Sequence, residues 1–373
     1  MKRIRIRPSF TLEKILDKAC DGGRLLEDEI RFLLGLNKEE EIDLLFKTAR
    51  YLRRCHFSNN VFLYGFLYFS TFCRNNCHFC QFRKFHTTLK RYRKKSSEIA
   101  EAARKMAAPG VHLIDLTMGE DPEFFDRGVG GFEKLIELVK SVKKITGLPI
   151  MVSPGVIPDN VLARFAECGA DWYACYQETH ARALFRRLRP GQSFDERMCK
   201  KYIAKRLGML VEEGILSGAG ESLDDVTSSI LVMRALDADQ VRVMNLVPQK
   251  GTPMENHTPP DIYRELIIIS VLRIVFPDKL IPASLDVDGL AGLKLRLDAG
   301  ANVVTSLVPP GAGLAGVANC CLDIEDGKRT PDSVMTVLRS CGLKSGELED
   351  YFAWINKRRL MINGHGGEEK IAC

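Results

Sequence analysis

The chain has 373 residues, of which 45% are hydrophobic and 27% charged, and its formal net charge is +6. This composition is ordinary for a soluble globular protein with a large buried core. No apolar run reaches the roughly 18 residues of a membrane span, and no apolar stretch follows the basic residues 1–7 to make a secretory signal. We expect the twelve cysteines to be reduced thiols with a few metal ligands rather than a disulfide framework, and the location to be cytoplasmic.

The N-terminal segment is predicted to be helical. Apolar residues recur at steps of three and four over 11–20, 26–36 and 39–55, with Asn37 as the candidate N-cap of the third helix. From residue 61 onward the pattern changes to short apolar runs separated by amphipathic stretches. We therefore expect residues 1–58 to form a small helical extension.

Eight apolar runs have the character of buried strands. They are 61–69, 111–116, 149–153, 172–176, 209–216, 240–246, 280–285 and 302–307. Helical stretches lie between them at 97–107, 131–146, 159–168, 180–187 with 194–207, 223–236, 260–276 and 289–297. Such alternation implies right-handed βαβ units, and eight units close a (β/α)8 barrel. The predicted fold is therefore an α/β, TIM-type barrel over 59–310, with an open doubly wound sheet as the alternative, and a C-terminal helical segment and tail over 311–373.

Three cysteines, Cys73, Cys77 and Cys80, follow the first run at C-x3-C-x2-C spacing. This spacing places three thiolates on one tight loop and indicates a metal or cluster site. A closed zinc site takes four ligands and a [4Fe-4S] cube takes one per iron, so three cysteines leave one iron open to a ligand that is not protein. A zinc site with His78 or His86 as the fourth ligand is the alternative.

A basic stretch follows the cysteine loop. Its members are Arg83, Lys84, Lys90, Arg91, Arg93, Lys94 and Lys95. Beside Tyr92 these residues could hold nucleic acid, but no second basic stripe accompanies them, so we favour a solvated face. The same charge could also receive an electron-donor protein with an acidic surface.

Polar residues gather at the ends of the apolar runs. Among them are Asp115, Ser153, Arg242, Ser284 and Asp286. Barrels of this kind carry their chemistry at the C-terminal ends of the strands, so these residues predict a polar cavity there. A helix N-cap is the plainer interpretation of any one of them, such as Ser153.

The cysteine spacing, with Phe79 just before the last cysteine, resembles the signature of the radical S-adenosylmethionine enzymes. The resemblance implies a [4Fe-4S] cluster whose open iron binds the amino and carboxylate groups of S-adenosylmethionine. An electron would then split this cofactor into methionine and a 5'-deoxyadenosyl radical. Two later segments are similar to the family: 118–120 stands where Gly-Gly-Glu is common, and 214–221 follows its G-x-I-x-G-x-x-E strand pattern with Leu216 in the isoleucine place.

Residues 178–179, 187–190 and 193–197 are similar to the biotin synthase and hydrogenase maturase branch. The resemblance implies that Glu178 contacts the cofactor and that Arg197 pairs with its methionyl carboxylate. A surface helix arginine is the alternative for Arg197. The further cofactor-binding residues that it implies are Glu120, Ser153, Gln177 and Gly218. No side chain is assigned a catalytic role, because the radical would carry the chemistry.

Within that branch, six segments most resemble the lysine mutases that open pyrrolysine biosynthesis: 69–73, 111–122, 176–179, 191–195, 241–244 and 281–286. The resemblance implies that Asp115, Arg242, Ser284 and Asp286 hold L-lysine. One cation and two anions would neutralise its carboxylate and two ammonium groups. The radical would abstract a side-chain hydrogen, and the lysyl radical would fragment and recombine to (3R)-3-methyl-D-ornithine in a sealed cavity.

Other interpretations stay open at this point. A biotin synthase-like or maturase-like enzyme acting on another small substrate is one, and a non-catalytic zinc or nucleic-acid binding protein is a more distant one. We expect no second cluster on Cys320, Cys321, Cys341 and Cys373, because adjacent cysteines cannot easily ligate one cube. The expected partner is a low-potential electron donor of the flavodoxin or ferredoxin type, and neither a membrane nor a nucleic acid is expected.

Overall fold

The computed structural model describes residues 11–309, 312–314, 316 and 329–364. Its central sheet has parallel strands in the order β6-β5-β4-β3-β2-β1-β8-β7. Their bounds are β1 (Asn60–Ser70), β2 (Leu113–Met118), β3 (Ile150–Ser153), β4 (Trp172–Ala174), β5 (Leu210–Ser217), β6 (Gln240–Asn245), β7 (Pro282–Ser284) and β8 (Val303–Leu307). One parallel bridge, Gln240 to Leu280, joins β6 to the start of β7 and completes the ring. The predicted (β/α)8 barrel is confirmed.

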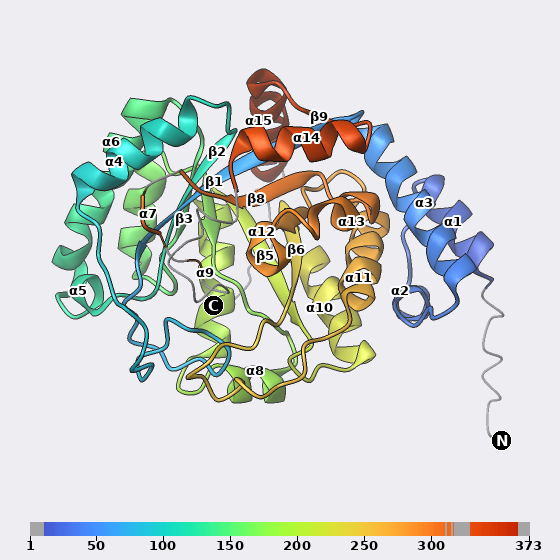
Figure 1. Ribbon diagram of the computed structural model, residues 1–373, viewed down its shortest axis with the longest axis horizontal. Helices are drawn as coiled ribbons and strands as arrows, with labels where there is room; N and C mark the ends of the chain where they lie inside the picture. Colours follow the sequence, from blue (N-terminus) through green and yellow to red (C-terminus); the bar gives the residue numbers. More distant parts are fainter. Residues whose placement is uncertain (1–10, 310–311, 315, 317–328, 365–373) are drawn as a thin grey trace.

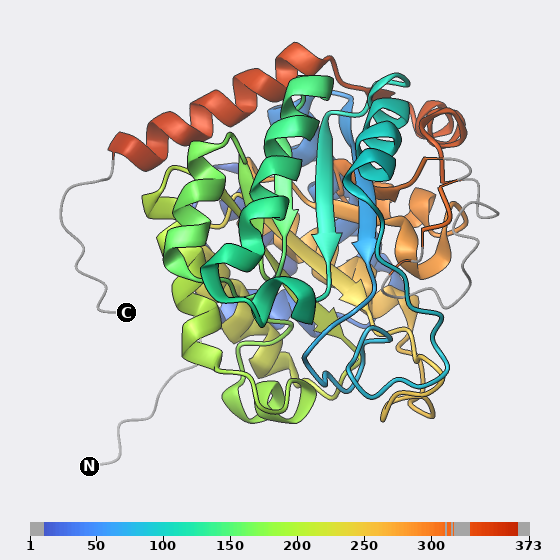
Figure 2. The same ribbon diagram turned by 90° about the vertical axis from the view of Figure 1, so that its left-hand side faces the viewer.

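Helices cover the outside of the barrel (Figures 1 and 2). They are α4 (Ser96–Ala107), α6 (Glu133–Thr146), α7 (Asp159–Glu167), α8 (Arg182–Leu188), α9 (Phe194–Arg206), α10 (Leu223–Ala235), α11 (Ile262–Val275) and α13 (Leu293–Asp298), with the short elements α5 (Pro122–Phe125), η1 (Gly128–Phe132) and α12 (Leu285–Asp288) after strands. Because helices cover one face of the sheet and the barrel interior the other, β1 is buried at every position after Asn60. This is why the strands appear in the sequence as unbroken apolar runs.

Three helices precede the barrel: α1 (Leu12–Cys20), α2 (Glu27–Leu34) and α3 (Glu39–Phe57). They pack at one side, next to α10 and α11 (Figure 1). Arg53 of α3 ties this layer to the barrel, donating to the backbone oxygens of Leu297 and Ala301. The predicted cap of α3 is wrong: its N-cap is Lys38, with no side-chain bond, and not Asn37. Three glutamates in the first turn favour the helix start through its dipole instead.

The C-terminal part contains α14 (Pro331–Ser340), a short strand β9 (Lys344–Ser345) paired with the start of β1, and α15 (Leu348–Gly364). Figure 2 shows α15 lying across the end from which the strands start. There the Tyr351 hydroxyl bonds that of Tyr64 at 2.6 Å, and Trp354 stacks on Trp172 with ring centroids 5.9 Å apart. The division of the chain into three segments at 58 and 310 stays a prediction.

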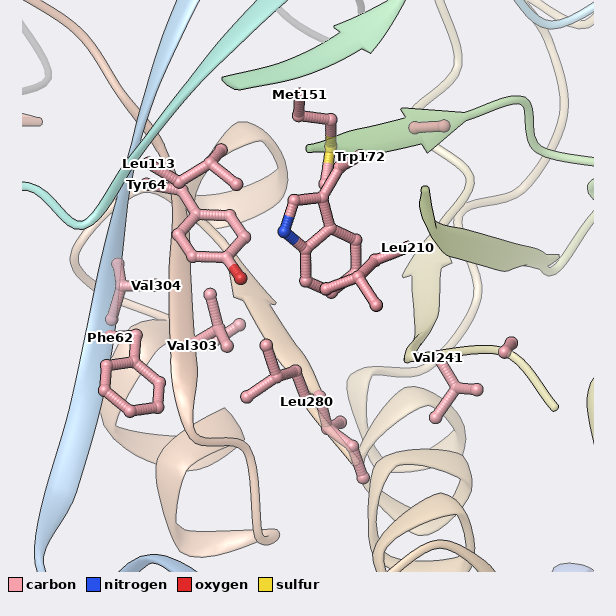
Figure 3. Close-up of a cluster of buried hydrophobic side chains, with 14 of the residues drawn as sticks. Phe62, Tyr64, Leu113, Met151, Trp172, Leu210, Val241, Leu280, Val303 and Val304 are labelled. Atoms are coloured by element: carbon pink, nitrogen blue, oxygen red, sulfur yellow. The ribbon is translucent and has the colours of Figure 1, made fainter. Parts of the chain in front are cut away.

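The N-terminal end of the barrel interior is a packed apolar core. Figure 3 shows Tyr64, Trp172, Leu280 and Val303 converging there from β1, β4, β7 and β8 and their flanks. Trp172, Leu280 and Val303 have no exposed surface. Because this end is filled, space for a ligand lies toward the C-terminal ends of the strands. None of the described helices combines the length and apolarity needed to cross a membrane.

Candidate active site

A cavity of about 200 Å³ lies at the C-terminal ends of the strands. Its wall includes most of the residues that the sequence singled out: Cys73, Cys77, Cys80, Asp115, Glu120, Ser153, Glu178, Arg197, Arg242 and Asp286. Gln177, Gly218 and Ser284 are not part of that wall. The barrel therefore brings the cysteine loop and the polar strand ends, which lie far apart in the sequence, to one space.

The cysteine loop is held in place by backbone bonds to other parts of the rim. Arg74 N donates to Glu120 O at 2.8 Å, and His78 N donates to Leu188 O at 2.9 Å. The three thiols are free. Burial raises the pKa of the Cys73 thiol to about 11 and that of Cys80 further. Metal ligation requires the thiolate, so bound iron would have to overcome this burial cost.

The donor set fits a cluster better than a single ion. No group of three His, Cys, Asp or Glu in the described ranges is placed to hold one metal ion. If the cysteines shared one zinc ion, any two of their thiolates would have to lie at most about 4.6 Å apart, because each would lie about 2.3 Å from the metal. His86, a proposed fourth ligand, uses both ring nitrogens, with Leu89 N at 3.0 Å and Lys250 O at 2.8 Å. Three cysteines on one cavity wall suit a cube that carries each of them on a different iron.

Two side chains that the sequence did not single out donate to Cys77. Gln192 Nε2 lies 3.0 Å from its Sγ, and an Arg189 guanidinium nitrogen lies 3.4 Å from it. Arg189 also donates to Glu178 Oε1 at 2.5 Å. Arg189 lies in the 187–190 segment used for the resemblance, but nothing in that segment shows that it turns toward a cysteine.

The predicted cofactor residues Glu178 and Arg197 face the cavity, Glu178 from the segment that follows β4 and Arg197 from α9. Glu178 has a φ of +67°, a left-handed conformation that is rare outside glycine and is found at functional sites. Ser193 caps α9 by accepting from Glu196 N at 3.1 Å, which places Arg197 in the helix's first turn. Arg197 Nε donates to Tyr176 O at 2.7 Å. Its backbone partner fixes the guanidinium toward the cavity.

Glu120 is already bonded within the protein. Its Oε2 accepts from Arg74 Nε at 2.9 Å and its Oε1 from Val156 N at 3.0 Å. The third partner is more distant, with an Arg197 nitrogen 3.7 Å from Oε1. Glu120 therefore stands between the cysteine loop and Arg197.

Three predicted cofactor residues are engaged in contacts within the protein. Gln177 is buried, with its amide oxygen 3.2 Å from Lys201 Nζ. Gly218 has a φ of +81°, and a Cβ there would lie 2.4 Å from Pro260, so only glycine fits this turn. Ser153 lines the cavity but donates to Asp115 Oδ1 at 2.8 Å. Their predicted contacts with the cofactor stay predictions.

We call the part of the cavity lined by Asp115, Arg242 and Asp286 the chamber, and Asp286 forms one side of it. Its carboxylate accepts from Tyr68 Oη at 2.7 Å and Ser306 Oγ at 3.0 Å, and Arg329 lies 2.7 Å from its other oxygen. Ser284 caps α12 by accepting from Asp286 N at 3.3 Å, so it holds the backbone of Asp286 in place. Arg329, 4% exposed, was missed by the sequence reasoning because it follows the last strand by more than twenty residues.

Arg242 forms the other side and is also paired. Its Nε lies 2.8 Å from Glu212 Oε1, and Glu212 Oε2 accepts from Tyr176 Oη at 2.7 Å. A further guanidinium nitrogen donates to Thr305 at 3.1 Å. Glu212 has no exposed surface and strongly favours the charged form of Arg242, whose pKa it raises against the effect of burial.

Asp115 differs because none of the described residues forms an ion pair with it. It is 1% exposed and lines the cavity, and the Ser153 hydroxyl donates to it at 2.8 Å. Burial is the main cause that raises its pKa to about 8, with the nearby Glu212 charge adding to it. This carboxyl is therefore poised to take a ligand cation.

A model of the radical SAM superfamily matches residues 67–231, the part of the barrel from β1 to α10. The chain is also 31% identical over 79% of its length, and 83% of the relative, to the hydrogenase maturase subunit HydE of Thermotoga maritima. With the cysteine loop at the mouth of a (β/α)8 barrel, these matches define the class: the chain belongs to the radical SAM superfamily. Its cofactors are accordingly a [4Fe-4S] cluster and S-adenosylmethionine.

The more particular likeness is to one enzyme. The 3-methylornithine synthase of Methanosarcina barkeri is 43% identical over 90% of this chain and 95% of the relative. The crystal structure of methylornithine synthase (PylB) superposes with a TM-score of 0.86 at 43% identity, over 91% of this chain and 99% of the other.

Proposed function

We propose that this protein is a radical S-adenosylmethionine isomerase that converts L-lysine to (3R)-3-methyl-D-ornithine, the first step of pyrrolysine biosynthesis. One observation carries the proposal: three free cysteines and a chamber of paired acids and arginines share a single cavity, in a chain 43% identical to 3-methylornithine synthase. When bound, the cluster and S-adenosylmethionine supply the one-electron chemistry that abstracts a substrate hydrogen.

Arg197 and Glu178 are the residues that we propose to orient the cofactor. A carboxylate is best recognised by a guanidinium fork, and the Arg197 guanidinium is fixed by the Tyr176 carbonyl and by a 3.4 Å bond from Nη1 to Gln192 Oε1. Glu178 offers negative charge near a sulfonium or an ammonium group. Both line the same cavity as the cysteine loop.

The chamber's charges support a dibasic amino acid. Arg242 and Arg329 are each ion-paired, with Glu212 and Asp286 respectively. Each of these two pairs is neutral, and Asp115 is the chamber acid that has no ion-pair partner among the described residues. Free lysine carries one net positive charge, and an ionised Asp115 would neutralise it. We propose that Arg242 binds the substrate carboxylate and that Asp115 and Asp286 accept from its ammonium groups.

An electron donor is required by enzymes of this class, and we propose that it docks beside the cysteine loop. Lys84 and Lys90 are exposed there, and Phe85 is 63% exposed between them. Arg91 and Arg93 are not available for docking, because they bind backbone oxygens and Asp121. A flavodoxin or ferredoxin with an acidic face would complement this patch.

Turnover of labelled lysine tests the function. The protein is reconstituted anaerobically with iron and sulfide, then incubated with a reductant, S-adenosylmethionine and isotope-labelled L-lysine. The proposal predicts 5'-deoxyadenosine or retained cofactor together with a labelled amino acid that has the mass of lysine but a different retention time. Unchanged lysine in a sample with a full complement of iron would contradict the proposal and would indicate another small substrate.

A further inference from the structure

The three cysteine sulfurs do not have equal surroundings. Cys77 is the buried one, 6% exposed, and receives two side-chain donors, Gln192 and Arg189. Cys73 accepts instead from a backbone group, Asn75 N at 3.4 Å. Within the described residues, the side-chain hydrogen bonds to the cysteine loop's sulfurs are thus concentrated on one of the three.

Arg189 connects this sulfur to the cofactor side of the cavity. Its guanidinium, 7% exposed, donates to Cys77 Sγ with one terminal nitrogen and to Glu178 Oε1 with the other. Its carbon Cζ lies 5.2 Å from the centre of the Phe79 ring, which supports the cation from one side. Arg189 is therefore held in one place by a sulfur, a carboxylate and a ring.

Gln192 makes the second connection. Its amide nitrogen donates to Cys77 Sγ, while its amide oxygen accepts from Arg197 at 3.4 Å and from Arg189 at 3.4 Å. Glu178 and Arg197 are the two residues that we propose to orient S-adenosylmethionine. Both of them thus reach Cys77 through a single intervening side chain.

We propose that Arg189 and Gln192 are positioning residues that raise the reduction potential of the cluster through Cys77 and make that potential depend on whether S-adenosylmethionine is bound. The inference rests on the proposed function, because it takes Cys77 as a cluster ligand and Glu178 as a cofactor contact.

The physical reason for the first part is electrostatic. Reduction adds one electron to the cluster, and hydrogen bonds from a cation and an amide to a ligating sulfur stabilise the added negative charge. Their presence makes reduction easier and so raises the potential. Arg189 should have the larger effect because it carries a full charge at a site with little solvent.

The second part follows from the Glu178 carboxylate. In the absence of cofactor, this carboxylate partly neutralises Arg189. A positively charged group of S-adenosylmethionine that binds Glu178 would offset part of the carboxylate's negative charge. Less of that negative charge would then oppose the Arg189 cation, so Arg189 would act more strongly on Cys77. Cofactor binding should then shift the potential upward, and the shift should require Arg189.

Spectroscopically monitored redox titration of the reconstituted protein, with and without S-adenosylmethionine, tests both parts. We expect Arg189→Gln to lower the midpoint potential and to lose most of the cofactor-dependent shift. Gln192→Leu should lower the midpoint by less. Arg187→Gln is the matched control: Arg187 lies at the end of α8, two residues before Arg189, but is exposed and bonds the Ala219 carbonyl instead of a cysteine, so its midpoint should equal that of the unaltered protein.

Iron content is measured on every sample. If Arg189→Gln does not hold a full cluster, Arg189→Lys and Gln192→Leu take its place, since Lys keeps the charge but cannot bridge Cys77 and Glu178 together. Equal midpoints and equal cofactor shifts in fully loaded variants would overturn the inference while leaving the function intact. Failure of the unaltered protein to bind iron or to isomerise lysine would instead overturn the proposed function.

Discussion

Lysine binding should expel a proton from Asp115. This carboxyl lies on β2 in the chamber, with Ser153 of β3, Glu212 of β5 and Arg242 of β6 around it, and its pKa is about 8 in the free protein. An ammonium group binds the ionised form, so the acid must lose its proton as lysine enters. At pH 7 a group with this pKa is about nine-tenths protonated. Binding should therefore release about 0.9 proton per lysine at pH 7 and about 0.5 at pH 8.

The affinity should follow the ionised fraction of Asp115. Between pH 6 and pH 8 this fraction rises roughly 50-fold, so the dissociation constant of lysine should fall by a similar factor. Calorimetry of lysine binding to the cofactor-loaded enzyme without reductant, in two buffers of different ionisation enthalpy, counts the protons directly. Asp115→Asn should release none and should lose the pH dependence. Tight binding by the unaltered protein with no proton release would refute the reasoning.

The same carboxyl should lower stability as the pH rises. The pKa of Asp115 in the folded protein is raised above its ordinary value of 3.8. The contribution of this carboxyl to the free energy of unfolding is therefore fully present below pH 3.8 and is lost as the pH rises to about 8. Asp115→Asn should therefore melt higher than the unaltered protein at pH 8 when lysine is absent. A lower melting temperature at that pH would mean that the carboxylate is stabilised by partners that the chamber does not show.

Three further predictions concern single side chains. Cys77→Ala should lose the iron-sulfur absorbance and most bound iron, whereas Cys341→Ala, outside the cysteine loop, should keep both; iron retained by Cys77→Ala would contradict the cluster assignment. Glu212→Gln should raise the KM for lysine by about 5- to 160-fold, because removing one partner of a buried charge pair costs about 1 to 3 kcal/mol, with a smaller effect on kcat; an unchanged KM would show that Arg242 does not depend on Glu212. Trp172→Ala should destabilise the fold by about 3 to 5 kcal/mol in denaturant titration, because it empties the packed end of the barrel; a loss of less than 1 kcal/mol would mean that the core collapses to fill the space.

The strands and the cysteine loop could be predicted because their signals are local. A parallel strand covered on both faces needs an unbroken apolar run, and each of the eight predicted runs overlaps a strand of the barrel. The three cysteines lie within eight residues, so their proximity needs no tertiary information.

The pairing of the charges could not be predicted, because it depends on which strand faces which. Glu212 and Glu213 are adjacent in β5 and both fully buried. Their side chains point to opposite faces, Glu212 to Arg242 in the chamber and Glu213 to Lys201 of α9, which with His180 lowers the pKa of Glu213 to about 2. Two glutamates in the middle of an apolar strand were the signal that the sequence offered, since buried carboxylates need partners.

The sequence also predicted one cation and two anions for lysine, which the structure refines. Arg242 and Asp286 are each ion-paired with a residue that was not singled out, whereas Asp115 has no ion-pair partner within the described residues. The expectation about a second cluster concerned Cys320, Cys321 and Cys373, which lie outside the described residues, and Cys341, which is free.

The proposed radical chemistry requires an iron atom that no protein side chain occupies and that faces the substrate chamber. Electron-nuclear double resonance of the reduced cluster, with S-adenosylmethionine labelled at its amino nitrogen, tests this most directly. We expect a hyperfine coupling from the labelled nitrogen that disappears with unlabelled cofactor. A coupling from a histidine nitrogen in its place, or no coupling to the cofactor at saturation, would contradict it.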